Sequence, residues 1–225
     1  MSAVAHIDEY KTGRFYSDEY RGDMSWNGYE NNNLLRNEGC RDDGTPRFSD
    51  VAMATGADDQ KDARGIAFAD FDNDGDLDLA INHNIGDHDL EGLANAVVLR
   101  NDIGHGRPWI AVDLVGTTAN RDAVGATVLV EVGGLRQLQL VSAGSAYASQ
   151  HSHRLIFGLG DAPDGESVGV DRLTVRWPGG GEETFENLDA RQVVRITQGQ
   201  GLETLTVGSG TLGEPAADQE TMEGP

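Results

Sequence analysis

The most telling segment of this 225-residue chain reads Asp70-Phe71-Asp72-Asn73-Asp74-Gly75-Asp76-Leu77-Asp78. Five of its nine residues are aspartates, and they occupy alternate positions. Calcium takes six to eight oxygen ligands, and a short acidic segment can supply most of them by curling around one ion. Gly75 stands where such a loop turns sharply, because a residue without a Cβ accepts the backbone angles of a tight turn. The segment therefore predicts a calcium-binding loop.

The five aspartates are the expected metal ligands. Asp70, Asp72 and Asp74 would point inward from alternate positions of the loop, and Asp76 would offer its backbone carbonyl. Asp78, at position nine, would close the cage around one Ca²⁺. The alternative is a turn rich in Asp, Asn and Gly that holds no metal, because the same residues also favour turns. Repulsion among unneutralised carboxylates at this density argues for the metal.

The flanks of the loop do not match an EF-hand. That motif requires a glutamate at position twelve, where this chain has Ile81, and it requires flanking helices. Residues 65–69 and 77–81 are instead short apolar runs of strand length. We therefore expect the acidic loop to join two strands.

Composition limits the classes of function. The chain has 17 Lys and Arg against 38 Asp and Glu, a net charge of −21, which argues against nucleic acid or an anionic membrane as a partner and favours cations. The same acidity also serves solubility or life at high salt, so it is not evidence for calcium by itself. The single cysteine, Cys40, excludes an internal disulfide. No signal peptide or membrane anchor is visible within residues 1–20.

The second half of the chain has the pattern of an all-β domain. From residue 107 to 207, apolar runs of five to eight residues recur about every ten residues between turns, which is typical of a sandwich or a barrel. The expected strands are residues 109–114, 126–132, 135–141, 154–157, 173–177, 183–185 and 193–196. Gly133-Gly134 between two of these runs indicates a hairpin.

Residues 1–106 form the other expected domain. The first 64 residues should be mostly loop with short strands, and residues 65–106 carry the acidic loop and a further strand at 96–100. Residues 208–225 are small, polar and acidic, and we expect a disordered tail.

Four segments in this order resemble the C-terminal portion of the ASPIC/UnbV family, which includes cartilage acidic proteins and proteins of enediyne gene clusters. They are residues 65–79, which resemble an FG-GAP repeat, and residues 120–126, 157–160 and 175–180. The resemblance implies a propeller-blade-like calcium repeat followed by an ASPIC/UnbV β-sandwich-like domain. It also favours an extracellular location, although the compartment stays open.

The chain departs from the propeller that this resemblance implies. A propeller needs four to eight blades of roughly 40–50 residues each, but only about 105 residues and one acidic loop precede the ASPIC/UnbV-like part. The strand edges of a single blade would need a cover, because unpaired edges promote aggregation. Self-association or a protein partner is therefore expected.

Two groups of histidines are candidates for further sites. His83, Asp87, His88 and Asp89 follow the acidic loop, but they lack a third nitrogen or sulfur ligand at zinc-site spacing, so a solvated loop is the simpler interpretation. His151 and His153 alternate in the sequence, and we expect them to share one face of a strand.

No residue of this chain receives a catalytic role from the resemblance. The sequence contains no nucleophile elbow, P-loop, dinucleotide fingerprint or zincin motif. Arg176, Trp177 and Tyr147 are candidates for a ligand groove, with Trp177 more simply placed in the core.

The sequence favours a non-enzymatic calcium-binding β module for protein or ligand binding or for assembly, with a structural Ca²⁺. One alternative is an enzyme of enediyne-type biosynthesis on a calcium-stabilised scaffold, and another is a self-assembling structural subunit. A deep pocket that contains His151, His153 or Tyr147 beside a carboxylate would favour the enzyme, and a flat or edge-strand surface would favour the binding module. A small-molecule ligand is compatible with each hypothesis, and we expect no membrane insertion.

Overall fold

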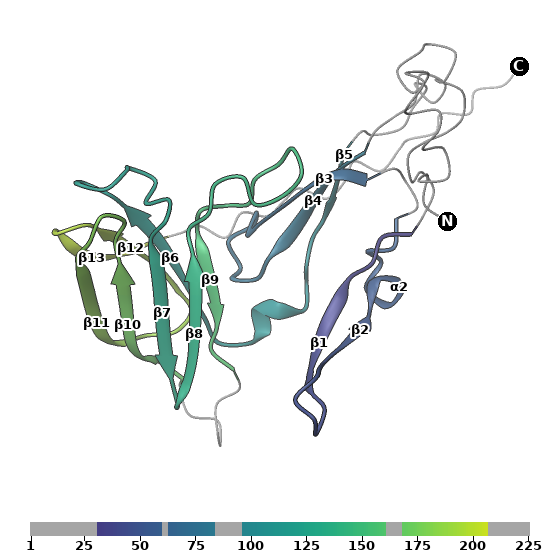
Figure 1. Cartoon of the computed structure of the whole chain (residues 1–225), viewed down its shortest axis with the longest axis horizontal. Helices are drawn as coiled ribbons and strands as arrows, with labels where there is room; N and C mark the ends of the chain where they lie inside the picture. Colours follow the sequence, from purple (N-terminus) through teal and green to yellow (C-terminus); the bar gives the residue numbers. More distant parts are fainter. Residues whose placement is uncertain (1–30, 60–62, 84–95, 161–167, 207–225) are drawn as a thin grey trace, which may run out of the picture. The chain divides into compact units, whose positions relative to one another are not determined.

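A computed structural model describes residues 31–59, 63–83, 96–160 and 168–206, and it is nearly all β (Figure 1). The chain divides into two compact units. The first comprises residues up to Ala69, Asp78–Asn101 and Ser142–Ser152, and the second comprises Asp70–Leu77, Asp102–Val141 and the residues from His153 onward. Within the described ranges, no helix has the length and apolar character needed to cross a membrane. The expected all-β class is confirmed.

The first unit contains a hairpin and a small sheet. Strands β1 (Leu35–Cys40) and β2 (Pro46–Asp50) pair antiparallel, and the single-turn helix α2 (Ala52–Thr55) follows. Strands β3 (Ala63–Ala69), β4 (Asp78–His83) and β5 (Ala96–Leu99) form an antiparallel sheet in that order. Strands β3 and β4 flank the acidic segment, as expected.

The free edge of β3 is covered by a segment from later in the chain. Ser149 Oγ donates a hydrogen bond to Ile66 O at 2.7 Å and accepts one from Ile66 N at 3.1 Å. Ser152 N donates to Phe68 O at 3.0 Å, and His151 stacks on Phe68 with 3.5 Å between the ring centroids. Because an uncovered edge invites pairing with other chains, this segment protects β3 within the same molecule.

The second unit is a sandwich of two four-stranded sheets. One sheet has the order β11-β10-β7-β8 and the other β13-β12-β6-β9. Their strands are β6 (Trp109–Val115), β7 (Thr127–Val132), β8 (Leu135–Leu140), β9 (Leu155–Gly158), β10 (Val170–Arg176), β11 (Glu182–Leu188), β12 (Gln192–Thr197) and β13 (Gly201–Leu205). Among the strands that the structure describes, only β6 and β12 pair in parallel. Strands β6 to β12 were expected, whereas β13 was missed.

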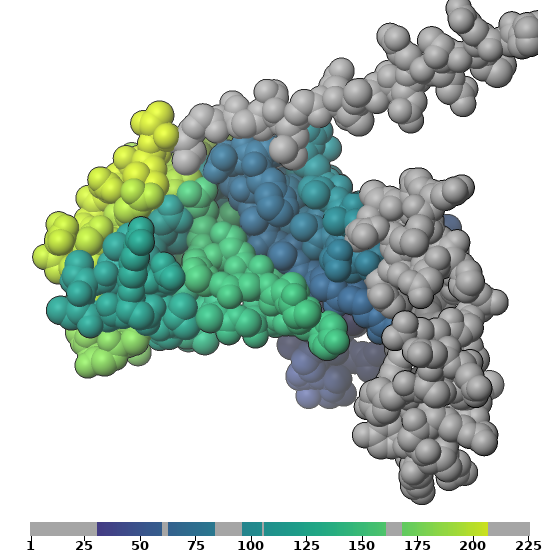
Figure 2. Space-filling view, turned by 90° about the horizontal axis from the view of Figure 1, so that it is seen from above, coloured from purple at the N-terminus to yellow at the C-terminus, as the bar shows by residue number. Residues whose placement is uncertain are grey.

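The core of the sandwich lies between the two sheets. Burial alternates along β7, so that Val128 and Val130 face inward, and Leu173 of β10 and Phe157 of β9 are fully buried with them. Each such side chain contributes about 1.5–3 kcal/mol when removed from water. Trp177 packs into the same core, as expected. In Figure 2 the yellow C-terminal strands and the teal strands of this unit form a continuous surface.

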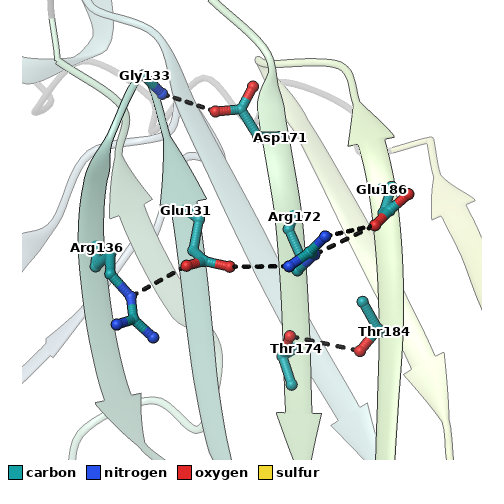
Figure 3. Close-up of polar contacts among 8 residues, drawn as sticks. All are labelled: Glu131, Gly133, Arg136, Asp171, Arg172, Thr174, Thr184 and Glu186. Atoms are coloured by element: carbon teal, nitrogen blue, oxygen red, sulfur yellow. Dashed lines mark hydrogen bonds and ion pairs between the residues drawn. The ribbon is translucent and has the colours of Figure 1, made fainter.

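The outer face of one sheet carries cross-strand pairs of charged side chains (Figure 3). Arg136 Nε lies 3.0 Å from Glu131 Oε1, and Arg172 Nη2 lies 3.0 Å from Glu186 Oε1. A longer contact of 3.9 Å joins Arg172 Nη1 to Glu131 Oε2. These pairs follow the cross-strand positions of β8, β7, β10 and β11, and each is worth little because it is exposed. They mark this face as solvated.

Candidate metal centre

The acidic loop curls around the side chain of its first residue. Asp70 Oδ1 accepts a hydrogen bond from Asp74 N at 3.0 Å, and Asp70 Oδ2 accepts one from Gly75 N at 3.1 Å. Asp74 Oδ1 in turn accepts from Asp76 N at 3.1 Å. Asn73 and Gly75 have φ angles of 59° and 99°, which Asn and Gly tolerate better than other residues. The turn residues of the sequence thus form the turn.

Three of the five aspartates bring carboxylate oxygens together. One oxygen from each of Asp70, Asp72 and Asp78 lies within 4.8 Å of the others. Asp78 is the first residue of β4 and only 1% exposed, and its Oδ1 accepts a hydrogen bond from Asn101 N at 2.8 Å. A group of hard carboxylate oxygens in one short segment suits Ca²⁺ by its donor chemistry. These residues therefore fit the predicted ion.

The other two predicted ligands, Asp74 and Asp76, have side chains outside this cluster. The Asp74 carboxylate holds the Asp76 backbone, as described above. Asp76 is buried, and its Oδ1 atom is shielded from solvent. A Cβ at Gly104 would lie 2.6 Å from Asp76 Cβ, so only glycine fits beside it. The complete ligand set, including the expected role of the Asp76 carbonyl, stays a prediction.

Burial sets the electrostatics of the loop. Desolvation raises the pKa of Asp70 above its ordinary value, and the charge of Asp74 acts in the same direction. The backbone N–H groups of Gly75 and Asp74 partly oppose the rise in the pKa. A carboxylate in such surroundings gains from a nearby cation.

The loop also contacts the sandwich within the second unit. A Cβ at Gly75 would lie only 1.8 Å from Trp109 Cε2, so the backbone at Gly75 lies directly against the indole ring. Arg154 Nη1 donates a hydrogen bond to Asn73 Oδ1 at 2.9 Å. The same guanidinium binds Asp113 through Nε at 2.9 Å and Nη2 at 3.1 Å. Sequence reasoning missed these contacts because Trp109 and Arg154 lie far from the loop in the chain.

The two histidines that were expected to share a strand face do not. Both precede β9, which begins at Leu155, so the expected strand was wrong. His151 Nδ1 accepts a hydrogen bond from Phe68 N at 3.4 Å, whereas His153 lines a pocket of the sandwich. The pocket has a volume of about 550 Å³ and is lined by Asp113, Leu114, Val115, Arg121, Asp122, His153, Arg154, Arg195, Thr197 and Glu203.

The remaining candidate residues do not form a shared site within the described residues. His83 is 4% exposed in β4, and its Nε2 lies 3.3 Å from Asp59 Oδ2, so this histidine is not part of a solvated loop. Residues 87–89, with the other members of that group, and residues 208–225 lie outside the described ranges. Tyr147 is 76% exposed, whereas Trp177 is in the core and its Nε1 donates to Glu183 Oε1 at 2.7 Å. Trp177 is therefore a core residue, the simpler of its two expected placements.

The fold and the loop define a class of protein, in which a hairpin with an acidic loop is joined to a β-sandwich. Residues 21–81 match the family model of the FG-GAP-like repeat, and residues 116–203 match the family model described as ASPIC and UnbV. The chain therefore combines an FG-GAP-like repeat with an ASPIC/UnbV domain, the family that its motifs resemble. A search of curated proteins found no match to the chain.

Proposed function

We propose that this protein is a non-enzymatic, calcium-stabilised β module for binding a protein or ligand or for assembly. One Ca²⁺ would be held in the loop of residues 70–78, with oxygens of Asp70, Asp72 and Asp78 among its ligands. The observation that carries the proposal is the convergence of these three carboxylates within 4.8 Å. The raised pKa of Asp70 adds to it, because desolvation and the neighbouring charge of Asp74 disfavour its ionised form.

The ion would have a structural role. When bound, it would neutralise carboxylates that otherwise repel one another, and it would hold the loop between β3 and β4 closed. An ion that binds only the folded state stabilises it by about 2.7 kcal/mol at 100 times Kd. For a chain of this size, that free energy corresponds to a rise of about 5–11 °C in Tm.

Thermal unfolding with calcium and with EDTA tests the proposal. Asp72→Asn removes one clustered carboxylate with little change of shape, and Glu186→Gln removes one charge from the solvated sheet face as a matched control. We expect calcium to raise the Tm of the wild type and of Glu186→Gln, and to raise that of Asp72→Asn much less. Equal shifts in both variants, or no shift in the wild type, would rule out calcium at this loop.

Self-association is the part of the proposal that concerns assembly. The covered edge of β3 removes one reason for a second copy, but the sandwich still ends in edge strands such as β8 and β13. Light scattering coupled to size exclusion, with calcium over a range of protein concentrations, measures the outcome. A constant monomer mass would leave binding to another protein or to a ligand.

The polar pocket supports a second candidate, an enzymatic or small-molecule-binding role of the sandwich. His153 shares the pocket with Asp113, Asp122 and Glu203, the combination of a histidine and a carboxylate expected of an enzyme. Thr197 is the single hydroxyl side chain among the lining residues, which gives little support to a nucleophile. A thermal-shift screen of small polar molecules on the wild type and on Arg195→Ala would favour this role if hits depend on Arg195.

A further inference from the structure

We propose that Trp109 and Arg154, two residues of the sandwich unit, position the acidic loop for metal binding. This inference rests on the proposed function, because it concerns the same loop. It adds that the metal site is completed by residues outside the FG-GAP-like repeat. Neither residue would be a ligand, and each would act by holding the backbone that carries the ligands.

Trp109 provides a rigid floor for the loop. It is the first residue of β6, it is 7% exposed, and it packs with Ala111 and Val193. Its backbone carbonyl accepts a hydrogen bond from Arg191 N at 2.6 Å. The indole is therefore fixed by the sheet on which it stands. Since the backbone of Gly75 lies directly against this ring, the middle of the loop cannot move inward.

Arg154 fixes the loop from the side. Two of its nitrogens bind both oxygens of Asp113, and a third binds Asn73 Oδ1. The Arg154 and Asp113 side chains are 21% and 20% exposed, and the bidentate geometry orients the guanidinium plane. Its Nη1 therefore approaches Asn73, the residue where φ is 59°, along a fixed direction. That contact stabilises an unusual backbone conformation between Asp72 and Asp74.

The charge of Arg154 separates positioning from simple electrostatics. A guanidinium beside a cation site opposes binding of the cation, so its effect as a charge would be to weaken the site. Asp113 offsets that charge by pairing with it. Arg154→Lys keeps the charge but loses the fork that reaches Asp113 and Asn73 together. A loss of metal affinity in this variant would thus report lost positioning and not a changed charge.

Terbium luminescence tests the contact between the Trp109 indole and the acidic loop. Tb³⁺ replaces Ca²⁺ in oxygen sites, and a tryptophan next to the site sensitises its emission. The chain has three tryptophans, so we compare Trp109→Phe with Trp177→Phe, both in a Trp26→Phe background. The Trp177 indole donates a hydrogen bond to Glu183 and packs in the core. We expect calorimetry to show weaker Tb³⁺ binding to Trp109→Phe than to Trp177→Phe, with sensitised emission lost only in Trp109→Phe. Equal Tb³⁺ affinities in the two variants, or emission that survives in Trp109→Phe, would overturn the role of Trp109.

Calorimetric titration with Ca²⁺ tests whether the contact from Arg154 to Asn73 positions the loop. Arg195→Lys is the matched control, because Arg195 Nη2 also faces Asp113, at 3.9 Å, and lines the same pocket without a contact to the loop. We expect Arg154→Lys to weaken Ca²⁺ binding about tenfold, as for other residues that orient metal ligands, and Arg195→Lys to leave it unchanged. Equal Ca²⁺ affinities in both variants would overturn the positioning role of Arg154. Absence of binding to the wild type would instead refute the proposed function together with this inference.

Discussion

Replacement of Gly75 by alanine probes the contact between the acidic loop and Trp109. The new Cβ would meet Trp109 Cε2 at 1.8 Å, and the φ angle of 99° is unfavourable for any residue with a Cβ. The backbone strain costs about 1–2 kcal/mol, and relief of the overlap costs about 1–3 kcal/mol more. We therefore expect Gly75→Ala to lower the free energy of unfolding by about 2–5 kcal/mol.

Gly181→Ala separates the two costs. Gly181 has a nearly equal φ of 96°, and a Cβ there would meet no atom within 4 Å. This control should show only the backbone strain. At about 2–4 °C per kcal/mol, an overlap cost of about 2 kcal/mol places the Tm of Gly75→Ala about 4–8 °C below that of Gly181→Ala. Thermal unfolding followed by circular dichroism in EDTA measures both. Equal losses of stability would refute the close approach of the loop to the indole.

Two further predictions concern the charge of the loop and the core. Burial raises the pKa of Asp70 above its ordinary 3.8, so the contribution of Asp70 to the stability of the metal-free protein is complete below that pH and is lost as the pH rises through the folded-state pKa. The Tm difference between calcium and EDTA should therefore widen from about pH 4 to pH 7. A difference that does not change with pH would count against Asp70 as a ligand. Leu173→Ala should cost about 2–5 kcal/mol in urea unfolding, since Leu173 is fully buried, whereas Leu138→Ala, at a position 67% exposed, should change stability by less than about 0.5 kcal/mol.

Local patterns were sufficient for most of the strands. Alternating or continuous apolar runs located β6 to β12, because burial on one or both faces imposes a period of two or an unbroken run. Strand β13 was not predicted because Gly201–Leu205 has no buried residue to give an apolar pattern, and the strand is held by its antiparallel pairing with β12. The same reasoning placed His151 and His153 on a strand, although their positions are set by contacts with Phe68 and with the pocket.

The acidic loop and the convergence of three of its carboxylates were predictable from the sequence, whereas the contacts that hold the loop were not. Alternating aspartates with a glycine are a local signal, since one segment supplies both the turn and the oxygens. Trp109 and Arg154 lie on separate strands or loops of the sandwich, and no spacing in the sequence connects them to Gly75 or Asn73. Such contacts arise from the tertiary fold and become visible only with coordinates.

The cover on the edge of β3 bears on how the chain can be divided. Residues 142–152, from within the stretch that matches the ASPIC and UnbV family, belong to the first compact unit, and residues 70–77, from the FG-GAP-like match, belong to the second. Each compact unit thus contains residues from both family matches. A single cut in the gene would leave β3 without Ser149 and Trp109 without Gly75, so the two segments are expected to be inherited, expressed and engineered together.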